Sequence, residues 1–287
     1  MRRKEGYAYR TSLKSSASDE LINTYLLRPA AGVLVRLLYG TRVTPNQLTI
    51  GSIAAGLVAA LLYAQASAQT TIVAGLLVTV KDILDGADGQ LARSRQQYSR
   101  AGRFLDSIGD FLVNAAVFAA FSGALYTQTG NPALLALGFL AFLGTTLRVS
   151  YHVHYQTAFL HLQGGYSLNR MTEELREEDL HANRGTVVLQ RIFQGLYGWQ
   201  DRLVSRLDSW CRHAIPLTPK VRSLWYADPL GLRLSSFLGL GTELSLLTVT
   251  SLFVRLDLYL CLNLFLMNGI WAGCIAYRRW VLSRRVR

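Results

Sequence analysis

Long apolar stretches recur along this chain of 287 residues, and they constrain its fold more than any other feature. A helix needs roughly 20 apolar residues to cross the hydrocarbon core of a membrane, which is about 30 Å thick. Six stretches approach or exceed this length, over residues 48–62, 71–84, 104–126, 134–151, 232–254 and 256–277. We therefore predict an all-α polytopic membrane protein with six transmembrane helices.

The segment before the first stretch has a different pattern. Residues 19–39 place apolar side chains at helical spacing, but Arg28, Pro29 and Arg36 lie among them. A charged amphipathic helix of this kind is typical of the membrane interface rather than of the membrane interior. We predict an N-terminal amphipathic helix that lies at the cytosolic face.

Positive charge is distributed unevenly around these stretches, and the net charge is +12. The loops near 65–70, 127–132 and 255–258 contain a single basic residue, Arg255. The arginines at 93–103 and the basic tail lie on the opposite side of the membrane in this arrangement. Cytoplasmic loops carry the excess of Lys and Arg, so we expect both termini in the cytosol. The same rule explains why the protein is basic, so its positive charge does not indicate nucleic-acid binding. The sequence contains no nucleic-acid-binding module either. We expect the inner or plasma membrane of a bacterium or archaeon.

The order of these segments suggests four parts. We expect a mobile N-terminus over residues 1–18, and the amphipathic helix with the first four spans over 19–160. Residues 161–228 mix acidic residues with many arginines, which indicates a cytosolic helical insertion. Residues 229–287 contain the last two spans and a basic tail.

Acidic residues lie at the ends of the second and third apolar stretches. Asp85 and Asp88 are three residues apart and Asp106 and Asp110 are four apart, so each pair shares a helix face. The connection between the two helices is short, which allows the four carboxylates to converge. Carboxylates at membrane depth are costly and repel one another, so a metal ion is the natural counter-charge. Oxygen ligands favour Mg²⁺, Mn²⁺ or Ca²⁺ rather than zinc, and two such ions can clamp a diphosphate.

The same segment contains a complete signature. From Asp85 to Asp110 the chain follows D-x-x-D-G-x-x-A-R-x8-G-x-x-x-D-x-x-x-D, with Gly89, Ala92, Arg93 and Gly102 at the remaining fixed positions. This pattern resembles the CDP-alcohol phosphotransferase family without a mismatch. The TPNQLT sequence before the first span is also similar to that family. The resemblance covers residues 19–160 and says little about the insertion.

The resemblance implies the roles of individual residues. It implies that Asp85, Asp88 and Asp106 hold divalent metal, with two ions of Mg²⁺ or Mn²⁺ expected. Asp110 is implied as the base that deprotonates the acceptor hydroxyl, and we also count it among the metal ligands. The residues implied to contact the cytidine-diphosphate donor are Gly89, Ala92, Arg93 and Gly102, with Asn46 and Thr49 of the preceding loop. A homodimer with a site open to the cytosol is expected from the same resemblance.

Several functions remain open at this point. The favoured one is transfer of a phosphatidyl group from CDP-diacylglycerol to an alcohol, with release of CMP, in phospholipid synthesis. The donor can instead be a CDP-linked small alcohol of the choline, ethanolamine or inositol type. A cation transporter is the distant alternative, because acidic residues can also line an ion path.

Two further charged residues interrupt apolar stretches. Arg148 lies within the fourth stretch, where an intramembrane arginine is a functional candidate. Either it binds a phosphate on the acceptor or on a lipid, or it pairs with one of the aspartates. Glu243, in the sequence GLGTELSLL of the fifth stretch, is a second acidic candidate, and we expect it at the membrane interface.

Overall fold

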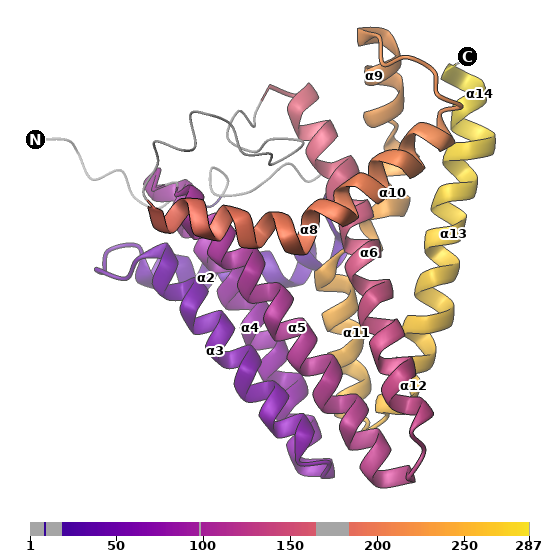
Figure 1. The fold of residues 1–287 in the computed structure, drawn as a ribbon. Helices are drawn as coiled ribbons and strands as arrows, with labels where there is room; N and C mark the ends of the chain where they lie inside the picture. The colour runs from indigo at the N-terminus through magenta and orange to yellow at the C-terminus, as the bar shows by residue number, and fades with distance from the viewer. Residues whose placement is uncertain (1–8, 10–18, 98, 165–183, 287) are drawn as a thin grey trace, which may run out of the picture.

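The computed structural model describes Tyr9 and residues 19–97, 99–164 and 184–286, and every regular element among them is a helix (Figure 1). The all-α prediction is therefore confirmed for these residues. The N-terminus predicted to be mobile lies, apart from Tyr9, outside the described residues. Part of the insertion predicted over 161–228 lies outside them too.

A bundle of roughly parallel helices forms the body of the protein. Its members are a C-terminal helix and the helices α3 (Pro45–Ala64), α4 (Ala68–Arg95), α5 (Arg100–Thr129), α6 (Ala133–Leu162) and α11 (Leu240–Leu252). The C-terminal helix consists of α12 (Leu256–Cys261), α13 (Asn268–Ala276) and α14 (Ser283–Val286). The π-helical segments η3 (Leu262–Met267) and η4 (Tyr277–Leu282) connect these three parts. Among the described residues, four helices are long and apolar enough to cross a membrane, namely α3, α5, α6 and the C-terminal helix. These four correspond to the first, third, fourth and sixth predicted spans, and they make this an integral membrane protein.

The fifth predicted span, 232–254, is not one continuous helix. The chain forms α10 (Pro229–Ser236), leaves helical geometry, and starts α11 only at Leu240. Gly239 is extended at the start of α11, and a Cβ atom there would clash with the carboxyl group of Glu20. Glycine is needed here because a distant segment of the chain packs directly against the backbone.

The N-terminal helix packs along α4 on one side of the bundle. It begins with the π-helical segment Asn23–Leu27 (η2) and continues as α2 (Arg28–Leu38). Leu27, Ala31 and Val35 are buried, whereas Leu26, Val33 and Leu37 are exposed. The helix therefore presents apolar side chains to the outside as well as to the bundle.

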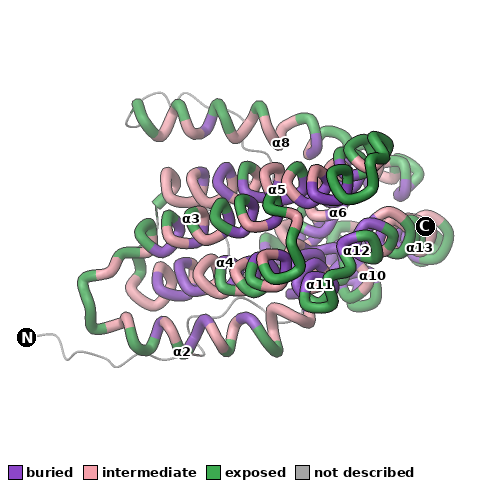
Figure 2. Tube along the Cα trace, turned by 90° about the horizontal axis from the view of Figure 1, so that it is seen from below, coloured by how far each residue is buried: buried purple, intermediate pink, exposed green. Residues whose placement is uncertain are grey.

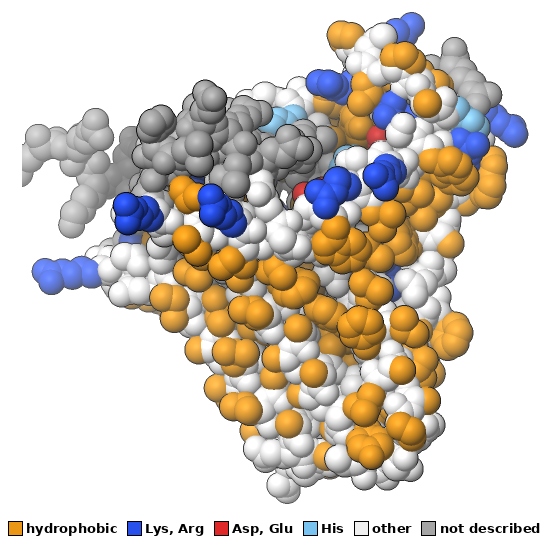
Figure 3. Space-filling model, in the orientation of Figure 1, with side chains coloured by type: hydrophobic (Ala, Val, Ile, Leu, Met, Phe, Trp, Pro, Cys, Tyr) orange, Lys and Arg blue, Asp and Glu red, His pale blue; other side chains and the backbone are white. Residues whose placement is uncertain are grey.

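On the opposite side of the bundle lies α8 (Arg184–Cys211), as the view from below shows (Figure 2). It crosses the bundle at a steep angle near the end where the chain terminates (Figure 1). It packs on α5 and α6, and α9 (Pro219–Tyr226) follows it. The space-filling view shows apolar side chains over the body of the bundle, while Lys and Arg gather toward the end with α8 (Figure 3).

Close packing between α3 and α5 sets the position of the acidic residues. A Cβ atom at Gly56 would clash with Val113, and one at Gly109 would clash with Ile53. Two small residues on facing helices therefore let the two backbones approach closely, as is common between membrane helices. Gly109 directly precedes Asp110, so this contact fixes the helix turn that carries that carboxylate.

Candidate active site

A cavity of about 490 Å³ lies between η2, α4, α5, α6, α8 and α11. Its lining includes Asp85, Asp88, Gly89, Arg93, Asp106 and Asp110, which are six of the eight signature residues. The structure thus brings the two halves of the signature together, as the helical spacing predicted. Ala92 and Gly102 do not line this cavity.

Three of the aspartates form a compact group. Oxygen atoms of Asp85, Asp88 and Asp106 all lie within 4.8 Å of one another. Three carboxylate oxygens at this spacing match the hard-oxygen ligand set that Mg²⁺ and Mn²⁺ prefer. The donor set therefore fits a divalent metal, and these are the residues that would hold it.

The short connection between α4 and α5 explains how the group forms. Gln96 ends α4 with a left-handed backbone conformation at a φ of 55°, which turns the chain sharply. Ser99 then starts α5, because its hydroxyl accepts a hydrogen bond from the Gly102 backbone N–H at 3.1 Å. The tight turn holds α4 and α5 side by side, so Asp106 lies next to Asp85 and Asp88.

Asp110 stands apart from this group and has its own partner. The Lys81 ammonium forms an ion pair with Asp110, and it lies 3.5 Å from an oxygen of Asp82. Lys81 is only 1% exposed, so this is a buried charge neutralised by two carboxylates. Asp110 thus lies outside the three-aspartate group, with Lys81 as its partner.

Sequence reasoning did not assign Lys81 a role. The available signal was a lysine inside an apolar stretch, four residues before Asp85, because intramembrane ionisable residues mark functional sites. Asp82 was visible in the sequence but lies outside the signature. The structure makes it the second carboxylate beside Lys81.

The start of α3 contacts the site through two residues that the family resemblance singled out. The Thr49 hydroxyl donates a short hydrogen bond to Asp88. Asn46 lies against Gly102, where a Cβ atom would be 2.6 Å from the Asn46 Oδ1 atom. Both residues are therefore beside the signature, although the cavity lining does not include them.

The arginines of the signature segment have different surroundings. Arg93 lines the cavity, and its guanidinium packs over Gly89, where a Cβ atom would be 3.1 Å away. Arg95 instead donates hydrogen bonds to the backbone carbonyls of Leu38, Tyr39, Thr41 and Val43. Arg95 thus holds the loop before α3, whereas Arg93 lines the cavity, as does Arg103.

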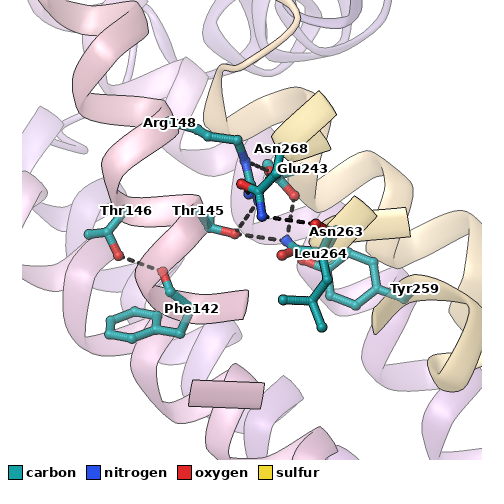
Figure 4. Close-up of polar contacts among 9 residues, drawn as sticks. All are labelled: Phe142, Thr145, Thr146, Arg148, Glu243, Tyr259, Asn263, Leu264 and Asn268. Carbon is teal, nitrogen blue, oxygen red and sulfur yellow. Dashed lines mark hydrogen bonds and ion pairs between the residues drawn. The ribbon is translucent and has the colours of Figure 1, made fainter. Parts of the chain in front are cut away.

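Arg148 is fully buried in a polar network of its own (Figure 4). It pairs with Glu243 at 2.5 Å, and it donates hydrogen bonds to Asn268 at 2.6 Å and to Thr145 at 3.0 Å. Glu243 is also fully buried, so the expectation that it lies at the interface is wrong. The partner of Arg148 is this glutamate rather than one of the signature aspartates, and Arg148 does not line the cavity.

The N-terminal segment closes another side of the cavity through Glu20. Its carboxyl group accepts hydrogen bonds from the Thr242 backbone N–H at 2.7 Å and from the Thr242 hydroxyl at 3.0 Å. It thereby caps the start of α11, where the helix dipole favours an anion. Burial raises the pKa of Glu20 to about 7, although the hydrogen bonds from Thr242 oppose this shift.

Helix α8 covers the cavity from the side of α5. Phe193, Tyr197 and Asp201 of this helix line it. The Tyr197 hydroxyl donates a hydrogen bond to the Ser107 carbonyl at 2.8 Å, next to Asp106. The insertion is therefore part of the site, which the sequence did not indicate.

Replacing Lys81 tests the charge balance of the cavity. Lys81→Met leaves Asp110 and Asp82 buried without their cation, and breaking a buried pair typically costs about 3–5 kcal/mol. We expect a lower thermal unfolding temperature in EDTA, with partial recovery in Mg²⁺ because the metal restores positive charge. Lys220→Met, at an exposed position in α9, is the matched control. Equal unfolding temperatures for Lys81→Met and wild type in EDTA would contradict the assigned role.

Comparison with known proteins supports the resemblance. Residues 42–162 match the family described as CDP-alcohol phosphatidyltransferase. The chain is 34% identical over 146 residues to a bifunctional IPC transferase and DIPP synthase of Thermococcus kodakarensis, which covers 50% of this chain and 31% of that protein. It is 35% identical over 126 residues to an archaetidylinositol phosphate synthase of Pyrococcus horikoshii, covering 44% of this chain and 60% of that protein.

For a further relative, the match covers a larger share of the relative's own length. The chain is 31% identical over 165 residues to an uncharacterized protein of Aquifex aeolicus, and the match covers 57% of this chain and 78% of that protein. By contrast, the chain spans less than a third of the bifunctional relatives that it matches. The matched residues include the whole signature and its four aspartates. The chain therefore belongs to the CDP-alcohol phosphatidyltransferase family, a family of transferases of phosphate-containing groups.

Proposed function

We propose that this protein transfers a phosphatidyl or phospho-alcohol group from a CDP-linked donor to an alcohol, with release of CMP. The observation that carries the proposal is the meeting of Asp85, Asp88 and Asp106 with Asp110 and Arg93 around one cavity. Such a set provides metal ligands, a base and a phosphate-binding cation within one space. The relatives named as transferases and synthases support the same reaction class.

The metal ligands in this proposal are Asp85, Asp88 and Asp106. A bound Mg²⁺ or Mn²⁺ pair would supply charge neutralisation for the diphosphate of the donor. Thr49 holds the orientation of Asp88 through its hydrogen bond. The glycine at 89 leaves room for the Arg93 side chain and for the donor phosphates.

The reaction itself is an in-line displacement at phosphorus. Asp110 takes the proton of the acceptor hydroxyl, and the resulting oxygen forms a bond to the β-phosphorus of the donor. The bond from that phosphorus to the oxygen of CMP breaks, and CMP leaves with the electron pair. Arg93 stabilises the phosphate charge, while Lys81 orients Asp110. Positioning and electrostatic stabilisation supply most of the rate.

The donor favoured here is CDP-diacylglycerol, and membrane lipids are then both surroundings and substrate. A CDP-linked small alcohol remains the second candidate donor. One relative is named an archaetidylinositol phosphate synthase, which supports including inositol phosphate among the acceptors to be tested. The acceptor-binding role suggested for Arg148 is less favoured, because Glu243, Asn268 and Thr145 already occupy its guanidinium. A homodimer stays a prediction of the family resemblance.

We further propose a six-span arrangement with the cavity and both termini on the cytosolic side. The positive side chains near α8 and the apolar body of the bundle support this orientation (Figure 3). In this arrangement α4 and α11 cross as the second and fifth spans. Helix α11 has only 13 residues, or about 20 Å, so its start lies below the membrane surface. The cavity is then recessed into the cytosolic leaflet, within reach of a lipid donor.

In the same arrangement α8 and α2 lie in the cytosolic membrane interface, on opposite sides of the bundle (Figure 2). Helix α8 has an exposed apolar stripe that recurs at steps of four and seven residues and consists of Val188, Ile192, Trp199, Leu203 and Trp210. Arg191, Arg202 and Arg206 flank this stripe and are exposed. Apolar and tryptophan side chains beside arginines are typical of a helix lying in the headgroup region. The insertion is thus proposed as a membrane-surface element, not as a purely cytosolic one.

Release of CMP is the direct test of the proposed reaction. Purified protein with Mg²⁺ or Mn²⁺ is given CDP-diacylglycerol or CDP-inositol together with a panel of alcohols, and CMP is measured. We expect metal-dependent CMP release that falls at least about a hundredfold in Asp110→Asn, because a general base typically contributes about 10²–10⁴ in rate. Donor binding should be largely retained in that variant. Asp257→Asn, at an exposed position paired with Arg255, is the control. Full activity of Asp110→Asn would contradict the proposal.

Spin labels on α8 test its place at the membrane surface. Leu203→Cys lies in the apolar stripe and Ser205→Cys on the exposed polar face, and both are made with Cys261→Ser because Cys261 is an exposed thiol. In lipid nanodiscs we expect the label at 203 to be accessible to oxygen and shielded from a water-soluble nickel complex. The label at 205 should show the reverse. Equal nickel accessibility at both positions would place α8 in water.

A further inference from the structure

The cavity extends beyond the aspartates into a polar end without carboxylates. Asn114 lies four residues after Asp110 on α5, which is about 6 Å farther along the helix axis. It lines the cavity together with Thr145 and Thr146 of α6. Because Asp106, Asp110 and Asn114 are spaced by four residues, they lie along one face of α5. The Asn114 side chain therefore continues the row of site residues away from the cytosolic end.

Asn114 has an unmet hydrogen-bonding capacity. Its side chain is 8% exposed, and its Oδ1 atom is buried without a hydrogen-bond partner among the residues that the structure describes. A buried polar atom left without a partner typically costs about 1–3 kcal/mol, so such atoms are rare unless a ligand or water completes them. Because Asn114 lines the reaction cavity, a molecule bound there is a candidate for this partner.

Thr145 supplies the complementary group. Its hydroxyl oxygen accepts hydrogen bonds from Arg148 at 3.0 Å and from Asn263 at 2.8 Å. A hydroxyl group has two acceptor lone pairs and one proton, so only the proton of Thr145 remains to be donated. Figure 4 shows how Arg148 and Asn263 converge on this hydroxyl. The network therefore fixes Thr145 as a hydrogen-bond donor.

The charges around this end of the cavity restrict what can bind there. The guanidinium of Arg148 is neutralised by Glu243 and lies behind Thr145, outside the cavity lining. The ammonium of Lys81 is neutralised by Asp110 and Asp82. Among the described residues that line the cavity, no uncompensated positive charge lies beside Asn114 for a phosphate group to bind. A neutral hydroxyl group can donate a hydrogen bond to the Asn114 Oδ1 atom and accept one from the Thr145 hydroxyl.

We propose that Asn114 and Thr145 bind a non-reacting hydroxyl group of a polyhydroxy acceptor and so select for polyols. The inference rests on the proposed transferase function, in which the reacting hydroxyl lies at Asp110. Asn114 would accept a hydrogen bond from the second hydroxyl, and Thr145 would donate one to it. Any charged part of the acceptor would then point toward the cytosolic end, where Arg93 and Arg103 line the cavity.

The test separates acceptor binding from the rest of the reaction. CMP release is measured with glycerol, myo-inositol and their monophosphates, and with inositol analogues that lack one hydroxyl group. Asn114→Leu should raise the KM for the best polyol about tenfold and leave the KM for the donor within twofold, as expected for one lost hydrogen bond. Thr145→Val should act in the same direction. Thr250→Val, a buried threonine that bonds only within its own helix, should change neither KM.

The deoxy analogues give a readout that a purely structural role would not change. One analogue should bind about tenfold more weakly than the parent polyol in wild type but equally well in Asn114→Leu, since the partner is already lost. Asn114→Ala serves as the second variant if the leucine variant does not fold. An unchanged acceptor KM in both Asn114 variants, or equal increases in acceptor and donor KM, would overturn the inference while the proposed function stands. No CMP release by wild type with any substrate pair would instead contradict the proposed function, and the inference with it.

Discussion

The burial of several carboxylates in one region of a membrane protein is the constraint on which the rest of this structure depends. These are five aspartates on the neighbouring helices α4 and α5, namely Asp82, Asp85, Asp88, Asp106 and Asp110. Such a group is stable only when its negative charge is compensated. The Lys81 ammonium compensates negative charge at Asp110 and Asp82, and the Thr49 hydroxyl donates a hydrogen bond to Asp88. The remaining charge lies on the other three aspartates, which would hold the divalent metal proposed above.

The same constraint explains the second buried ion pair. Arg148 and Glu243 are both fully buried, and each of their charged groups is completed by amide or hydroxyl partners on neighbouring helices. A buried pair of this kind seldom adds much stability, but it demands one specific arrangement of its helices. Here it joins α6, α11 and the C-terminal helix behind the cavity. Its consequence for the site is that Thr145 is held in one orientation.

Much of the site followed from the sequence because helical periodicity is a local property. The spacing of Asp85, Asp88, Asp106 and Asp110 predicted that they converge. All four line one cavity, but only Asp85, Asp88 and Asp106 form a compact group. The pairing of Lys81 with Asp110 and of Arg148 with Glu243 could not be predicted in the same way. These contacts join helices whose relative rotation depends on packing far apart in the chain, such as Gly56 against Val113.

The break before α11 and the position of α8 beside the cavity also depend on contacts between residues far apart in the chain. At the break before α11, Glu20, more than two hundred residues earlier, occupies the space beside Gly239. The glycines around it were visible in the sequence, but their partner was not. The place of α8 beside the cavity likewise depends on contacts such as Tyr197 with Ser107. From its composition, that segment was predicted only to be a charged insertion.

Metal binding by the three-aspartate group is the most direct test of this account. Purified protein is titrated with Mn²⁺, and the free ion is followed by electron paramagnetic resonance. The account predicts saturable binding by wild type and by Asp257→Asn, and at least about tenfold weaker binding by Asp85→Asn and Asp106→Asn. Equal Mn²⁺ affinity in all four proteins would contradict the central claim, because the buried carboxylates would then not be the metal site.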